Sequence, residues 1–160
     1  DAQFDYMKKI LMMSTGFAAY VQIQNFGKFL KNCKNHSNIN EGIKAIYDVS
    51  KQNDEWITRL AAVQTLVDVA NYSDSQAKLA MKASDPSTEN SWKEHISIAS
   101  KYVDELKRAT KEWADYNNKV IDAQVNFLKS VKNKRGNIAG SNTSKIRETF
   151  IKNLNEFLTS

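Results

Sequence analysis

The chain has 160 residues, of which 41% are hydrophobic and 26% charged, and it contains five glycines, one proline and one cysteine. This composition excludes wholesale disorder, a disulfide framework and a fold of many short strands, which would need more turn residues. The formal net charge of +5 serves solubility as readily as nucleic-acid binding. The length is typical of one domain, so we predict a single all-α domain over residues 1–160.

The stretch "MKKILMMSTGFAA" at 7–19 has the charge and apolar order of a secretory signal peptide. However, apolar residues recur at helical steps of four and three from before this stretch to beyond it. This row predicts a core helix over about 3–34, with a retained targeting segment as the alternative. Its members are Tyr6, Ile10, Met13, Phe17, Tyr20, Ile23, Phe26, Leu30 and Cys33. No apolar run is long enough for a membrane span, so we predict no transmembrane segment.

A second helix is predicted over 39–83, with Asn38 and Glu41 as a capping box. We expect a break near 71–75, where Ser73 and Gln76 can form another capping box; an unbroken helix is the alternative. The apolar row of this helix is Ile39, Ile43, Ile46, Trp56, Leu60, Val63, Val67 and Ala70.

A third helix is predicted over 86–134, because Asp85 is a good N-cap and Pro86 suits the first helical position. Apolar residues repeat in heptads along it, and the row includes Trp92, Ile96, Ala99, Val103 and Leu106. Asn117 and Gln124 are polar members that we expect to set the register of packing or to line a polar seam. A glycine-containing loop follows, and a short C-terminal helix is predicted over 144–158. Short connections favour antiparallel neighbours. The sequence therefore predicts an elongated antiparallel bundle, up-down-up, with a short returning helix.

No catalytic, cofactor-binding or metal-ligating motif occurs in this pattern. His36 and His95 lie far apart in the sequence and are predicted to be surface or capping residues, while Cys33 is predicted to be an inert thiol. Three tryptophans lie on or beside the apolar rows, at Trp56, Trp92 and Trp113. Core packing is the default interpretation of these indoles, and a small-ligand pocket between helices is the alternative.

The placement of positive charge is the most distinctive feature. In an up-down-up bundle, the ends of the first and third helices and the start of the fourth meet at one pole. The basic residues there are Lys28, Lys31, Lys34, Lys129, Lys132, Lys134, Arg135, Lys145 and Arg147. Cations favour helix C-termini, which explains the lysines and arginine at the ends of the first and third helices. It does not explain Lys145 and Arg147, which lie in the first turn of the fourth helix. We therefore predict a candidate contact for an anionic partner.

These features favour a non-enzymatic helical interaction module from an envelope-associated or secreted setting, acting as a subunit or adaptor with a protein partner. The second hypothesis is a periplasmic or extracellular sensor-type bundle that binds a small molecule between helices. The third is a peripheral binder of an anionic membrane or nucleic acid through the basic pole.

Overall fold

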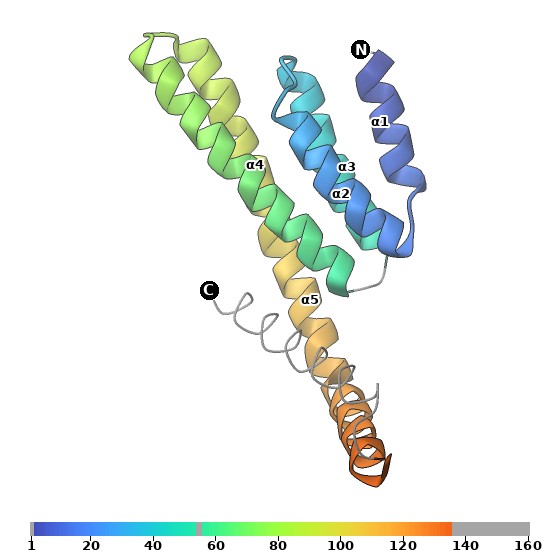
Figure 1. Cartoon of the computed structure of the whole chain (residues 1–160). Helices are drawn as coiled ribbons and strands as arrows, with labels where there is room; N and C mark the ends of the chain where they lie inside the picture. Colours follow the sequence, from blue (N-terminus) through green and yellow to red (C-terminus); the bar gives the residue numbers. More distant parts are fainter. Residues whose placement is uncertain (1, 54–55, 136–160) are drawn as a thin grey trace. The chain divides into compact units, whose positions relative to one another are not determined.

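A computed structural model describes the backbone of residues 2–53 and 56–135 and the side chains of residues 2–53 and 57–112. The regular elements of this part are α-helices, with no strand among them, which confirms the all-α prediction. The helices are α1 (Ala2–Met13), α2 (Gly16–Leu30), α3 (His36–Gln52), α4 (Trp56–Lys82) and α5 (Pro86–Arg135) (Figure 1). None of the helices in this part is long and apolar enough to cross a membrane.

The chain divides into two compact units, residues 1–110 and 111–160. The first unit holds α1 to α4 and the N-terminal half of α5. In the second unit, the described part is the helical backbone of α5 from 111 to 135. The predicted helix over 144–158 lies outside the described residues, and the single domain over 1–160 stays a prediction.

The prediction of one helix over 3–34 is wrong. The chain leaves α1 after Met13 and enters α2 at Gly16, which has a φ of +59°. Glycine adopts this left-handed conformation without steric cost, and the Ser14 hydroxyl donates to the Ile10 carbonyl at 2.7 Å, which satisfies an acceptor of the last turn of α1. The two helices therefore form a hairpin in which the predicted apolar row is interrupted.

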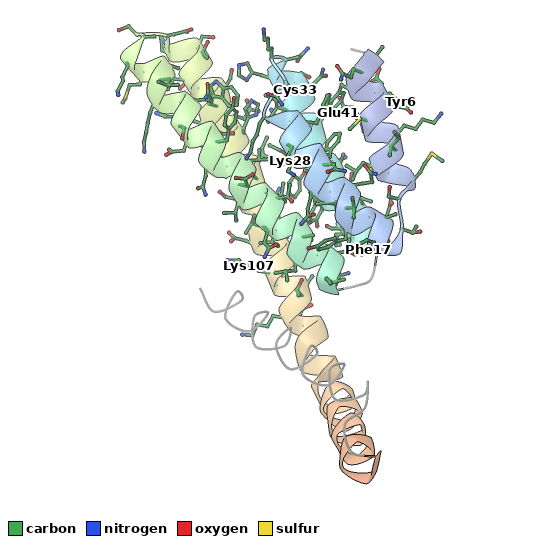
Figure 2. The ribbon with its side chains drawn as sticks, viewed as in Figure 1. Tyr6, Phe17, Lys28, Cys33, Glu41 and Lys107 are labelled. Atoms are coloured by element: carbon green, nitrogen blue, oxygen red, sulfur yellow. The ribbon has the colours of Figure 1, made fainter. Side chains whose placement is uncertain are left out.

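The break also changes which residues are buried. Phe4 and Leu11 of α1 are fully buried, whereas the predicted core residues Tyr6, Met13 and Phe17 are 65%, 73% and 77% exposed. Figure 2 shows Tyr6 on α1 and Phe17 at the start of α2. From Tyr20 onward, the predicted apolar row agrees better with the observed burial. The α2 residues Ile23, Phe26 and Leu30 are in the core, as expected.

Asn53, at the C-terminal end of α3, holds the α1–α2 connection. Its side-chain oxygen accepts from the Gly16 amide at 3.1 Å, and its side-chain nitrogen donates to the carbonyls of Ser14 at 3.4 Å and Val49 at 2.8 Å. One buried amide therefore satisfies the first backbone N–H of α2 and a carbonyl that follows α1, groups that have no partner within their own helices.

We expect Asn53→Ala to lower the free energy of unfolding by about 2 kcal/mol, because it leaves buried donors and acceptors unpaired. Hydrogen exchange of the Gly16 amide should accelerate more than that of core amides in α2. Ser50 is the matched control, since its hydroxyl donates to the Tyr47 carbonyl within α3; Ser50→Ala should leave Gly16 exchange unchanged. Equal acceleration of all α2 amides in Asn53→Ala would contradict a local role.

The second predicted helix, over 39–83, is also two helices. It begins earlier, at His36, because the Asn35 side chain caps it by accepting from the amides of Ser37 and Asn38. The break falls after Gln52 rather than near 71–75, and α4 runs through that segment unbroken. The Ser73 hydroxyl donates to the Val69 carbonyl at 2.8 Å within the helix. This i−4 bond lets serine sit inside a helix instead of ending it.

Helix α2 packs against α4, and a glycine allows the two backbones to approach closely. A Cβ atom on Gly27 would lie 2.2 Å from Thr65 Cγ2, so a side chain at position 27 requires Thr65 or the helices to shift. Gly42 of α3 receives Leu30 and Phe26 of α2 in the same way. The core consists mainly of aliphatic residues, with Ile39, Ile43, Ile46, Val49, Ala61, Ala62, Val63 and Leu66 among its fully buried members.

The α4–α5 connection is very short, and the start of α5 at Pro86 was predicted correctly. Two bonds close the end of α4, from the Asp85 amide to the Ala80 carbonyl at 3.0 Å and from the Ser84 amide to the Met81 carbonyl at 3.1 Å. Ser84 has a φ of 56° between them, so the turn is a Schellman motif. Asp85 then caps α5 by accepting from the Thr88 amide and hydroxyl. The chain reverses between α4 and α5 within a few residues (Figure 1).

Candidate functional site

A pair of histidines joins α3 to α5. His36 Nδ1 lies 2.8 Å from His95 Nε2, and the other ring nitrogen of His95 bonds to Asn40 Oδ1. His95 is fully buried, whereas His36 is partly exposed at the start of α3. The two imidazoles are stacked, with ring centroids 5.0 Å apart. Residues 59 positions apart in the chain are thus held in one hydrogen-bonded row.

The row fixes where the protons lie. The Asn40 oxygen only accepts, so His95 Nδ1 must donate to it, and a neutral His95 then offers Nε2 as an acceptor. His36 Nδ1 donates into that acceptor. A second proton on His95 Nε2 would require His36 to carry its own proton on Nε2, so that its Nδ1 becomes the acceptor. Burial, together with the nearby His36, lowers the pKa of His95 to about 4. His95 is therefore neutral at physiological pH.

The prediction that His95 is a surface or capping residue is wrong. Its side chain is in the core, and its partners are on α3. The sequence did hold a partial signal, because His36 and Asn40 are four residues apart and share one helix face. Nothing in the spacing, however, shows which face of α5 meets them.

Trp92, a candidate lining residue of a ligand pocket, is packed among aromatic rings. Its indole has edge-on contacts with His36 at 5.0 Å, His95 at 5.3 Å and Tyr72 of α4 at 5.8 Å between centroids. The residue is 9% exposed, and a ligand pocket beside it stays a prediction. The side chains of the other two candidates, Trp56 and Trp113, lie outside the described residues.

A second contact joins α3 to α5 two turns further on. The Tyr47 and Tyr102 rings stack with centroids 4.3 Å apart, and Lys51 Nζ lies 5.6 Å from the centre of the Tyr47 ring. Burial and a hydrogen bond to Glu105 raise the pKa of Tyr47 to about 12. Tyr47 stays neutral under physiological conditions, which suits a structural contact.

An open groove of about 350 Å³ lies between α4 and α5. It is lined from α4 by Val67, Ala70, Asn71 and Asp74, and from α5 by Ile96, Ser100, Val103 and Asp104. Val67 is 38% exposed, although the sequence pattern assigned it to the core. Ala70 and Ile96 are also accessible in part, so apolar side chains form the floor of the groove.

The predicted basic pole remains a prediction. Of its members in the first unit, Lys28 (Figure 2) and Lys34 are exposed near the end of α2. Lys31 forms an ion pair with Asp68 of α4. The side chains of Lys129, Lys132, Lys134 and Arg135, and all of Lys145 and Arg147, lie outside the described residues. Asn117 and Gln124 also lie beyond the described side chains.

The titratable residues of the described part do not form a metal centre, since no group of three or more His, Cys, Asp or Glu side chains converges there. Burial raises the pKa of the Cys33 thiol, which disfavours the reactive thiolate. No family model matches the sequence, and neither a curated protein nor a solved structure matches it. Function is therefore proposed from the geometry of the chain itself.

Proposed function

We propose that this protein is a non-enzymatic helical interaction module, and that the groove between α4 and α5 is its contact surface. The open groove, with an exposed valine in its apolar floor, is the observation that carries the proposal. The finer elements of the proposal are an elongated antiparallel bundle with heptad packing, and a role as an envelope-associated or secreted subunit or adaptor.

The physical support comes from apolar surface that folding leaves uncovered. Val67, Ala70 and Ile96 are each accessible in part, and covering them with a partner's apolar side chains removes that surface from water. Other exposed apolar residues, such as Met13 and Phe17, lie on either side of the α1–α2 connection. Exposed apolar side chains are common on soluble proteins, but those in the groove share one concave surface.

A small-molecule ligand in the same groove is the second candidate function. The volume of about 350 Å³ is within the usual range of small-ligand pockets. The lining supplies apolar contacts and a few polar groups, including Asn71 and Ser100. The groove is open rather than enclosed, which favours a protein partner over a ligand that must be buried on most sides. Binding of an anionic surface through the basic pole is the third candidate.

The interaction function is tested by placing a photoreactive benzophenone side chain at Val67 in the producing cell. We expect a discrete cross-linked adduct with another protein, because Val67 lies in the proposed contact. The control is the same group at Phe17, which is 77% exposed and outside the groove. Non-specific stickiness would label position 17 at least as well. Equal labelling at both positions, or none at 67, would contradict the proposal.

A further inference from the structure

The charged side chains that line the groove are both acidic. Asp74 comes from α4 and Asp104 from α5. Because the two helices run in opposite directions from their short turn (Figure 1), Asp74 lies towards the Ile96 end and Asp104 towards the Val67 end. The groove therefore carries a carboxylate near each end and an apolar floor between them.

The distance between the two ends of the groove corresponds to about two turns of an α-helix. From Ile96 to Asp104 is eight residues, or about 12 Å along an α-helix at 1.5 Å per residue. Residues seven or eight positions apart on a second helix lie on one face, at about the same spacing. Two basic side chains at that interval can reach both carboxylates while the residues between them contact the floor.

We infer that the occupant of the groove is an amphipathic helix from a partner protein, with two lysine or arginine residues seven or eight positions apart on its apolar face. This inference rests on the proposed function and adds the chemistry of the partner. Helices bind in grooves through residues spaced along one face, and charge complementarity fixes orientation and speeds association. The negative charges of Asp74 and Asp104 favour a basic helix over an acidic one.

The contacts already made by Asp74 leave it available to a partner. It pairs with Lys78 on its own helix at 2.9 Å, and both side chains are more than half exposed. An exposed i,i+4 pair of this kind contributes little to stability. Exchanging Lys78 for a partner's cation therefore has a small cost.

The test is selection from a phage-displayed library of helical peptides with one face randomised. The baits are wild type, the double variant Asp74→Asn/Asp104→Asn and the control Asp48→Asn, whose carboxylate faces Lys44 on α3. We expect wild type and the control to enrich peptides with two basic residues seven or eight positions apart. The affinity of a selected peptide should fall roughly tenfold in the double variant and should weaken with added salt.

Enrichment of peptides without the basic pair, or equal binding to the double variant, would overturn the inference. So would enrichment of acidic peptides, or no enrichment above background. If any of these occurs while position 67 still cross-links to a protein, the inference fails and the interaction function survives. If the cross-linked adduct at position 67 is a second copy of this chain, self-association replaces the basic helix. Loss of peptide binding in Val67→Lys would place the selected peptides in the groove, and retained binding would place them elsewhere.

Discussion

The free energy of unfolding is expected to fall by roughly 3 kcal/mol as the pH is lowered from about 7 to about 4. In the folded chain the pKa of His95 is about 4, against an ordinary value of 6.5. Between these pH values His95 is protonated in the unfolded chain but neutral in the folded chain, so a lower pH favours unfolding. A shift of one pKa unit corresponds to about 1.4 kcal/mol. Urea titrations followed by circular dichroism over this pH range measure the effect.

The groups around His95 support this origin. His36 and Asn40 face it from α3, Trp92 precedes it on α5, and Tyr72 of α4 reaches Trp92. None of these provides an anion that would stabilise an imidazolium. Asp85, whose pKa is lowered by hydrogen bonds from Thr88, loses its contribution only as the pH falls through still more acidic values.

His95→Gln is the matched variant, because glutamine keeps an acceptor for His36 without a group that titrates in this range. It should be less stable than wild type at neutral pH and should lose most of the dependence between pH 6.5 and 4. The same fall in stability in wild type and His95→Gln would assign the acid sensitivity to other groups.

The second large effect is expected at Gly27. Gly27→Val should lower the free energy of unfolding by about 3 kcal/mol, because overpacking a well-packed contact has a cost of this size. The new Cβ would meet Thr65 Cγ2 at 2.2 Å, and Thr65 is β-branched and 8% exposed, so it has little room to turn. Gly27→Ala should cost about 1 kcal/mol even though alanine is the better helix former. Chemical denaturation measures both variants.

A rescue variant separates this clash from a general intolerance of the position. Thr65→Ser removes the methyl group that the new Cβ meets, so Gly27→Ala/Thr65→Ser should recover most of the stability lost by Gly27→Ala alone. Non-additivity is the signature of residues in contact. If the two losses simply add, the close approach of α2 and α4 does not limit the size of residue 27.

Local signals in the sequence predicted local features well. Asp85 and Pro86 gave the start of α5 because a side-chain cap and a fixed φ act within one turn. Trp92, Ala99, Val103 and Leu106 were assigned to a buried row by their spacing, and all are buried. Ile39, Ile43 and Ile46 were identified in the same way. The helical period is a property of the segment itself, so it can be recognised without its neighbours.

The breaks and the site depended on residues far apart in the chain. The apolar row continued across Ser14, Thr15 and Gly16, and the side chain that stabilises the break there is Asn53, 37 residues from Gly16. His95 is buried because α5 turns that face towards His36 and Asn40. The groove lies between α4 and α5 and includes Val67 and Ile96 in its lining. Periodicity assigned both residues to the core, since it reports a face and not the distance to the next helix.

The α4–α5 turn has a consequence for how this chain can vary in length. Its Schellman bonds and the Asp85 cap fix the length and conformation of the connection. The turn therefore determines which α5 residues lie opposite each α4 residue. One extra residue within α5 before His95 would rotate every later side chain by about 100° around the helix axis. His95 would leave His36, and a different face would line the groove. Insertions and deletions between 80 and 95 should therefore be selected against more strongly than exchanges of residue type, even at exposed positions.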